Sequence, residues 1–90
     1  MNAKRVLIAE DEPHIVESLR FILSREGYDV DDAGDGESAC RSLAAERPDL
    51  VILDVMLPLL NGFEVLRRLR ADPATTGLPV IMLTAKGQAQ

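Results

Sequence analysis

Residues 51–58 read Val-Ile-Leu-Asp-Val-Met-Leu-Pro, and this stretch decides the fold. A strongly apolar run ends in one carboxylate, Asp54, and Pro58 turns the chain soon afterwards. The pattern predicts a buried strand over residues 50–54 with an acid at its carboxyl end. In open α/β sheets, ligands bind and chemistry takes place at this end of the strands. The plainer alternative is that Asp54 only caps the turn that follows, a position where aspartate is favoured.

A second acidic group follows another short apolar run, residues 6–9. The acids are Glu10, Asp11 and Glu12, and they stand directly before Pro13. Two strand ends that carry carboxylates into one crevice make a site for a hard cation. A carboxylate held beside such a cation is able to accept a phosphoryl group. Alternatively, these acids merely favour the N-terminus of a helix that begins at Pro13.

Strands and helices alternate along the chain. The predicted strands are residues 6–9, 28–33, 50–54 and 79–84, and the predicted helices begin near residues 13, 37 and 63. Apolar spacing predicts that the inward side chains of these helices are Ile15, Leu19, Ile22 and Leu23, then Ala39 and Leu43, then Phe63, Leu66 and Leu69. Alternation of this kind implies an α/β domain with a parallel sheet and right-handed crossovers.

The composition limits the possible functions of the protein and its possible cellular location. Ninety residues fit one small domain, whose core must be aliphatic because only 3% of the residues are aromatic. The net charge of −5 argues against nucleic-acid binding through a basic face of this segment. The single Cys40 cannot form an internal disulfide, which suits a reducing compartment. The sequence shows no membrane-spanning stretch and no signal peptide, so we expect a cytoplasmic protein.

Four ordered motifs carry a family resemblance. They are Val-Leu-Ile-Ala-Glu-Asp-Glu-Pro at 6–13, Leu-Asp-Val-Met-Leu-Pro at 53–58, Asn-Gly-Phe-Glu at 61–64 and Leu-Thr-Ala at 83–85. With these motifs, the chain resembles the receiver domain of bacterial two-component response regulators (CheY-like). The resemblance implies a doubly wound, flavodoxin-like parallel sheet with strand order 2-1-3-4. It also implies phosphorelay signalling, with phosphorylation by a histidine kinase or phosphotransfer protein. Such a domain is a phosphoacceptor rather than an enzyme, and at most catalyses its own phosphotransfer and dephosphorylation.

The resemblance assigns a role to each residue of the acid site. Asp54 would be the phosphoacceptor. Asp11 would bind Mg²⁺ directly, together with Asp54 and the backbone carbonyl of Met56, and Glu10 would help through a water. General chemistry supports these roles, because Mg²⁺ offsets the repulsion between a carboxylate and an anionic phosphorus centre. Mg²⁺ also prefers a few carboxylates together with waters.

Two further roles lie near residue 84. Thr84 would hydrogen-bond the phosphoryl group, and Ala85 would contribute a backbone N–H and leave room for Thr84 to move. The plainer alternative makes Thr84 an ordinary β-branched strand residue. In the family, a lysine beside the fifth strand contacts the phosphoryl group. Lys86 stands in the wrong place for that lysine.

The family pattern usually continues with a helix, a fifth strand and a final helix. Residues 1–90 are therefore expected to form a receiver domain that lacks this C-terminal part, a truncated βαβαβαβ unit. The alternative function is a truncated interaction or oligomerisation module that has the acid site but no productive switch. A flavodoxin-like mononucleotide binder is less well supported, because the acids at 10–12 would repel a phosphate.

Apolar residues outside the predicted core suggest contacts with other molecules. Residues 80–83 would lie at an open sheet edge, and the absence of a final helix would uncover apolar surface on one face of the sheet, beside Ile15, Leu19 and Ile22. Such surfaces invite association, so we expect a homo-oligomer that forms through the fourth strand or the first helix. The pair Leu59-Leu60 is unusual in a loop. It either covers the active-site side of the sheet or forms an exposed contact patch.

Overall fold

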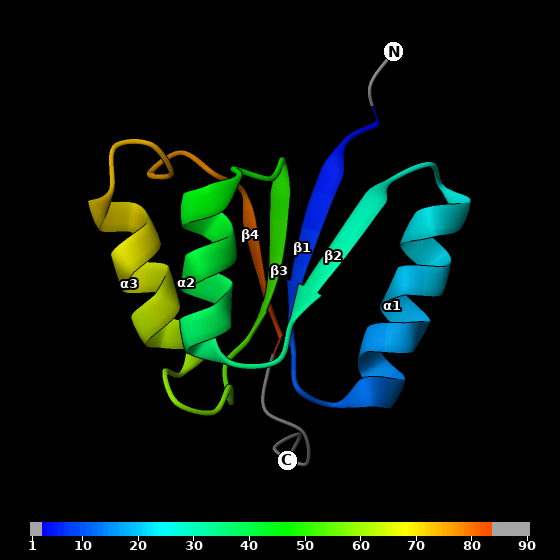
Figure 1. The fold of residues 1–90 in the computed structure, drawn as a ribbon, viewed down its shortest axis with the longest axis horizontal. Coiled ribbons are helices and arrows are strands. Elements are labelled where there is room, and N and C mark those ends of the chain that lie inside the picture. The colour runs from blue at the N-terminus through cyan, green and yellow to red at the C-terminus, as the bar shows by residue number, and fades with distance from the viewer. Residues whose placement is uncertain (1–2, 84–90) are drawn as a thin grey trace.

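The computed structural model describes residues 3–83 (Figure 1). The elements in chain order are β1 (Arg5–Ala9), α1 (Pro13–Arg25), β2 (Asp29–Ala33), α2 (Gly36–Ala45), β3 (Leu50–Asp54), α3 (Gly62–Ala71) and β4 (Val80–Leu83). The predicted alternation of strands and helices is therefore confirmed, with small differences at the element ends. Within the described residues, no helix is long and apolar enough to cross a membrane.

The strands form one parallel sheet in the order β2-β1-β3-β4. This order confirms the predicted flavodoxin-like fold and places β1 and β3 at the centre. Figure 1 shows α1 on one face of the sheet and α2 and α3 on the other. Because the strands are parallel, their carboxyl ends all lie at the same edge of the sheet, which we call the carboxyl edge.

Alternate residues of the central strands point to opposite faces and build two cores. One core lies under α2 and α3 and includes Leu7, Ala9, Val51, Leu53, Val65 and Leu69. The other lies under α1, where Val6, Ile8 and Ile52 meet Val16, Leu19 and Leu23. Both cores are aliphatic, as the composition predicts. They hold β1 and β3 from both sides and so fix the positions at which these strands end.

Two residues predicted to face the core are exposed instead. Ile22 of α1 is 56% exposed and Phe63 of α3 is 61% exposed. Val16 and Val65, which the prediction omitted, pack toward the sheet in their helices. The difference arises from the rotation of each helix about its own axis. The apolar stripe on a helix is broad, so the spacing of apolar residues does not show which side of the stripe packs against the sheet.

Helix α2 begins at a charged cap. The Asp35 carboxylate accepts a hydrogen bond from the backbone N–H of Ser38 at 2.7 Å and another from the Ser38 hydroxyl at 3.1 Å. The backbone hydrogen bond from Ser38 is the main cause that lowers the pKa of Asp35 below its usual value. A depressed folded-state pKa means that the cap stabilises the fold above the unfolded-state pKa. This stabilisation is lost as the pH falls through the folded-state value.

Asp35→Ala is expected to lower the urea midpoint of unfolding at neutral pH, because helix α2 loses its N-cap acceptor. The difference from wild type should shrink at a pH below 3.8, the ordinary pKa of the group, as the wild-type carboxylate takes up a proton. Urea unfolding at both pH values measures this. Asp35→Asn, which keeps an acceptor oxygen, is the matched control. An equal loss at both pH values would argue against a role for the charge.

Candidate functional site

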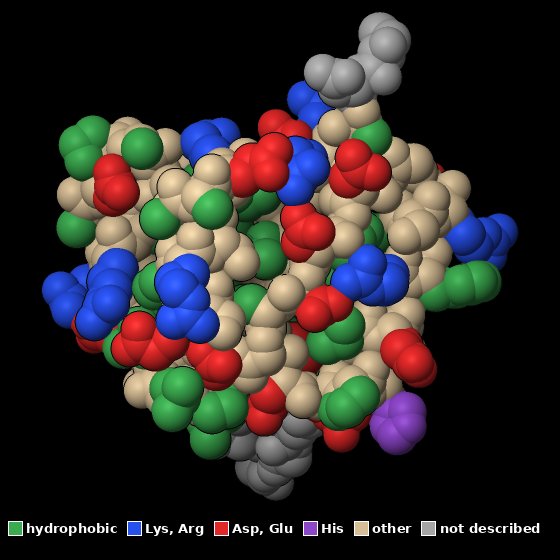
Figure 2. All heavy atoms as spheres, viewed as in Figure 1, with side chains coloured by type: hydrophobic (Ala, Val, Ile, Leu, Met, Phe, Trp, Pro, Cys, Tyr) green, Lys and Arg blue, Asp and Glu red, His purple; other side chains and the backbone are tan. Residues whose placement is uncertain are grey.

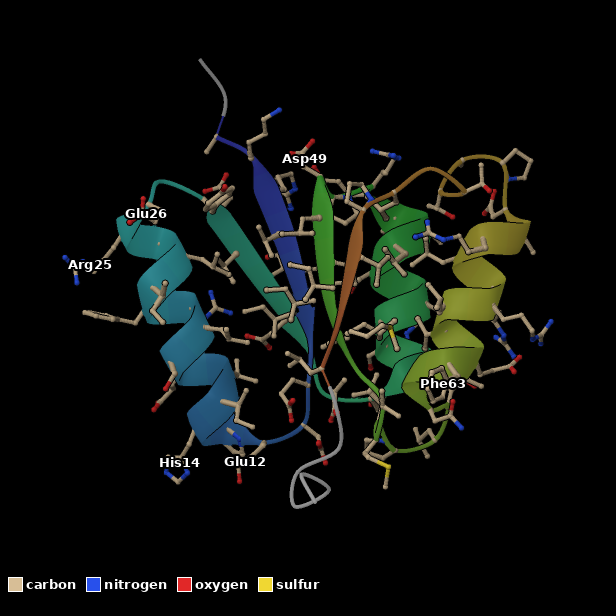
Figure 3. The ribbon with its side chains drawn as sticks, turned by 180° about the vertical axis from the view of Figure 1, so that it is seen from behind. Glu12, His14, Arg25, Glu26, Asp49 and Phe63 are labelled. Atoms are coloured by element: carbon tan, nitrogen blue, oxygen red, sulfur yellow. The ribbon has the colours of Figure 1, made fainter. Side chains whose placement is uncertain are left out.

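The strand register brings both acidic stretches to the carboxyl edge. Ala9 of β1 pairs with Leu53 of β3. Glu10 and Asp54 are the next residues in the chain, so they emerge from neighbouring strands at the centre of the sheet. Figure 3 shows Glu12 at the start of α1, at the same end of the molecule as Phe63, with Asp49 at the opposite end.

Three carboxylates meet at this edge. Glu10, Asp11 and Asp54 each offer an oxygen, and these oxygens lie within 4.8 Å of one another. Asp54 has no exposed surface, Glu10 is 2% exposed, and Asp11 is exposed. Clustered like charges repel one another, and burial raises the free energy of a carboxylate. An all-oxygen donor set that reaches solvent on one side suits a small hard cation that keeps several waters. The residues present therefore fit Mg²⁺.

Backbone N–H groups orient the two buried carboxylates. The N–H of Met56 donates to Oδ1 of Asp54 at 3.1 Å, and the N–H of Glu12 donates to Oε2 of Glu10 at 3.0 Å. The N–H of Glu10 itself donates to the carbonyl of Ala33 in β2 at 3.0 Å. The turns that follow β1 and β3 thus hold these acids in fixed directions before any ligand binds.

Two glycines fix the loop that follows Asp54. A Cβ at Gly62, the first residue of α3, would lie 2.2 Å from the carbonyl oxygen of Asp54. A Cβ at Gly36, the first residue of α2, would lie 1.8 Å from the carbonyl oxygen of Leu60. The N–H of Gly36 also donates to the carbonyl of Pro58 at 3.1 Å. Both helices therefore begin in direct contact with the end of β3 or with the loop between β3 and α3.

The structure places most of the predicted site residues. The three carboxylates lie together, as described above. Met56 contacts Asp54 through its backbone N–H, while the Met56 residue is 58% exposed. Thr84 and Ala85 lie outside the described residues, so their roles stay predictions. The sequence interpretation missed the packing roles of Gly36 and Gly62. The signals in the sequence were the Gly34-Asp35-Gly36 stretch and the Asn61-Gly62 pair, each of which stands at the start of a helix.

Comparison with known proteins identifies the family. The family model of the response regulator receiver domain matches residues 6–90. The chain belongs to this family. Among curated relatives of this receiver chain is the alkaline phosphatase synthesis transcriptional regulatory protein PhoP of Bacillus subtilis. It is 47% identical over 85 residues, which are 94% of this chain and 35% of that protein. The receiver chain thus spans about a third of the length of the curated relatives that it matches first.

Solved receiver structures resemble the chain closely. The N-terminal domain of a response regulator receiver protein from Methanoculleus marisnigri is 42% identical with a TM-score of 0.87, covering 94% of this chain and 69% of that one. The receiver domain of a sensor histidine kinase from Pseudomonas aeruginosa is 32% identical with a TM-score of 0.89, covering 98% of this chain and 72% of that one. That structure has a magnesium ion coordinated in its active-site cleft.

Asp11→Asn is expected to weaken Mg²⁺ binding by the receiver chain at least about tenfold, because even the loss of an outer-shell partner costs this much in metal sites. It should also raise the melting temperature of the metal-free protein, since it removes one of three clustered negative charges. A Mg²⁺ titration followed by NMR, with thermal melts in chelator, measures both. Asp29→Asn, an equal charge change in β2 away from the cluster, is the control. Unchanged Mg²⁺ affinity in Asp11→Asn would contradict the assignment.

Proposed function

We propose that this receiver chain is a phosphorelay component that binds Mg²⁺ and accepts a phosphoryl group on Asp54 from a histidine kinase or phosphotransfer protein. One observation carries the proposal. Asp54 ends the central strand β3, is fully buried, and has carboxylate oxygens of Glu10 and Asp11 within 4.8 Å. An aspartate that only caps a turn does not need other carboxylates nearby. A phosphoacceptor needs a cation beside it, and neighbouring carboxylates can bind that cation.

The residues that would hold Mg²⁺ are Asp11 and Asp54, with the carbonyl of Met56 and with Glu10 acting through a water. When bound, the ion supplies charge neutralisation and alignment of the reacting oxygens. The protein itself positions the Asp54 carboxylate. The N–H of Met56 holds Oδ1 of Asp54, and burial of Asp54 keeps bulk water from competing for the carboxylate.

The transfer itself is a simple exchange of bonds. A carboxylate oxygen of Asp54 forms the new bond to phosphorus, while the bond from phosphorus to the donor breaks. The donor group leaves with the electron pair of the broken bond and then takes a proton. Because phosphoryl transfer depends mainly on positioning and charge stabilisation, no further nucleophile or base is required of the chain.

Intact-mass measurement after incubation with acetyl phosphate tests the proposal. With Mg²⁺, the wild-type chain should gain one phosphoryl group, and fragmentation should locate it at Asp54. Chelation of Mg²⁺ should prevent the gain. An unchanged mass in the presence of Mg²⁺ would favour the alternative, an interaction module that has the acid site but no productive phosphorylation.

The proposal also covers the cellular location of the protein, its partners and its output. We infer that residues 1–90 act as a cytoplasmic signalling module rather than as a metabolic enzyme. The net charge of −5 favours protein partners over nucleic acid for this segment. Because the curated relatives are much longer, the output that phosphorylation controls belongs to regions or partners beyond the matched segment.

We also propose self-association through β4 or α1. Within the described residues, β4 has no neighbour on its outer side, and Ile81 is 51% exposed. On α1, Phe21 and Ile22 are 63% and 56% exposed. Exposed strand edges and apolar patches of this kind favour association.

Light scattering over a concentration series should show a dimer or larger species of the receiver chain. Ile81→Lys should shift the equilibrium toward monomer if β4 forms the contact, and Phe21→Ser should do so if α1 forms it. Glu37→Lys, a charge change at an exposed position of α2, on the other face of the sheet from α1, is the control. A well-folded monomer at high micromolar concentration would rule out this part of the proposal.

A further inference from the structure

A cavity of about 350 Å³ lies between α2 and α3. The two helices stand side by side on one face of the sheet (Figure 1). Both begin at the carboxyl edge, where Gly36 and Gly62 contact the loop after β3 or the end of β3 itself. The lining residues come from the middle and end of both helices and from the segments that follow them. The cavity therefore lies toward the opposite end of the molecule from the acid site, and its volume is typical of small-molecule sites.

The floor of the cavity is apolar. Leu43, Val65 and Leu69 line it, and all three belong to the core under α2 and α3. The margin carries small side chains, because Ala44 of α2 and Ala74 after α3 are exposed alanines of the lining. Larger side chains at these two positions would fill the space. The cavity is therefore able to take up an apolar group and remove it from water.

The lining residues carry a net positive charge. Arg47 and Arg68 are exposed cations, and Asp72 is the one acid among these lining residues. Two positive charges and one negative charge leave a net charge of +1, whereas the whole chain carries −5. Figure 2 shows Lys and Arg side chains across α2 and α3, at the left of the view. A ligand of complementary charge is therefore a monoanion.

Arg47 is held in place without being neutralised. Its Nε donates to the carbonyl of Ala74 at 3.0 Å, and its Nη1 donates to the carbonyl of Pro48 at 3.3 Å. Within residues 3–83, no carboxylate forms an ion pair with Arg47, and its Nη2 has no hydrogen-bond partner. The guanidinium is thus fixed by neutral carbonyls, while one nitrogen stays available. A fixed, planar guanidinium is well suited to bind a carboxylate.

Arg68 is only partly neutralised. Its Nε lies 3.6 Å from Oε2 of Glu64. The same carboxylate accepts two hydrogen bonds from Arg67, which lies outside the cavity lining. Because Glu64 is shared with this closer arginine, Arg68 retains charge for an anion in the cavity.

We propose that the cavity between α2 and α3 is a binding site for a small amphipathic carboxylate, a molecule with an apolar body and one negative charge. The apolar body fills the space over Leu43, Val65 and Leu69, and the carboxylate lies between Arg47 and Arg68. Neither half of such a ligand suffices alone. A small inorganic anion leaves the apolar floor in contact with water, and an uncharged apolar molecule makes no use of the arginines.

Octanoate is the probe, because it joins a straight apolar chain to one carboxylate. Octanamide keeps the chain without the charge, and acetate keeps the charge without the chain. Titration of each into the receiver chain, followed by amide NMR, should give the lowest Kd for octanoate, with shifts centred on residues 40–47 and 65–75. Octanamide and acetate should bind at least about tenfold more weakly, because each lacks one of the two contributions.

The two arginines are tested by Arg47→Gln and Arg68→Gln. Each variant should weaken octanoate binding about tenfold, the effect of losing one charge-assisted hydrogen bond, and should leave octanamide binding unchanged. Arg41→Gln removes an exposed arginine of α2 that does not line the cavity, so it is the matched control and should bind octanoate as the wild type does. Thermal melts check that each variant is folded.

The apolar space is tested by Ala44→Leu, which should weaken the binding of octanoate and octanamide alike because the larger side chain fills the cavity. Ala71→Leu, at an exposed position of α3 outside the lining, is its control. Octanoate should also slow the alkylation of Cys40 by iodoacetamide, since this lining residue is the only cysteine of the chain. Intact mass measures this reaction.

Equal affinity for octanoate and octanamide would overturn the inference, because the arginines would then contribute nothing. So would NMR shifts confined to α1, where Phe21 and Ile22 are exposed, or an unchanged rate of Cys40 alkylation at saturating octanoate. If no probe binds, the cavity has no ligand of this class and the inference fails. Labelling of Asp54 by acetyl phosphate is a separate measurement, so the proposed function stands or falls independently.

Discussion

Replacement of Asp54 with asparagine is expected to abolish phosphoryl uptake completely. The amide has the shape of the carboxylate and retains an acceptor oxygen for the N–H of Met56, which donates at 3.1 Å in the wild type. It lacks the anionic oxygen that attacks phosphorus, and no other residue of the cluster ends a strand as a fully buried acid. Intact-mass measurement with acetyl phosphate and Mg²⁺ should therefore show a single phosphoryl group on wild type and none on Asp54→Asn.

The same variant should be more stable than wild type without metal. It removes one of three carboxylates whose oxygens lie within 4.8 Å of one another. If relief of this repulsion is worth about 1 kcal/mol, the melting temperature should rise by about 4–8 °C for a domain of this size. Thermal melts in chelator measure the change. A phosphoryl group retained on Asp54→Asn would mean that another residue is the acceptor.

Gly62→Ala is expected to destabilise the fold strongly. Of the glycine positions described, only Gly36 leaves less room for an added Cβ. The added Cβ would lie 2.2 Å from the carbonyl oxygen of Asp54 and 2.9 Å from its carbonyl carbon, and both are backbone atoms that cannot rotate away. Overpacking of this kind typically costs about 1–3 kcal/mol, and the gain in helix propensity offsets no more than about 1 kcal/mol. We expect a net loss of about 2 kcal/mol in the free energy of unfolding.

Gly34→Ala and Gly77→Ala are matched controls for this prediction. A Cβ at either position would meet nothing within 4 Å, and neither glycine has a positive φ. Both variants should be neutral or slightly more stable, by up to about 1 kcal/mol. Urea unfolding compares the three variants. If Gly62→Ala is as stable as these controls, α3 is free to move away from β3. Phosphoryl uptake should also slow in Gly62→Ala, because any shift of the Asp54 backbone moves its carboxylate.

Sequence patterns predicted the features that depend on order along the chain. The apolar runs before Glu10 and Asp54 predicted strands, and strands that alternate with helices imply a parallel sheet. From this alone, the carboxylates were expected to converge, and the structure places their oxygens together. The family resemblance then supplied the strand order. The geometry of the acid site therefore follows from features that a single sequence displays.

The remaining features depend on contacts that no pattern displays. Ile22 and Val16 both fit an apolar stripe on α1, and only the angle at which the helix meets the sheet separates them. The role of Gly62 arises because the start of α3 touches a carbonyl at the end of β3. The left-handed backbone of Leu59 was equally hidden, since leucine gives no sign of positive φ.

The central position of β1 has a consequence for the time course of folding. Its partner on one side is β2, the next strand in the chain, but its partner on the other side is β3. At the start of β1, Arg5 donates its N–H to the carboxylate of Asp49, a residue 44 positions later. During synthesis, β1 therefore emerges long before its second neighbour exists. One edge of β1 stays unpaired until residues 50–54 have been synthesised. Pairing of β1 with β3 also closes a long loop of chain, which slows folding. We expect the first 48 residues alone to remain unfolded, and cooperative structure to appear only in chains that include all of β3.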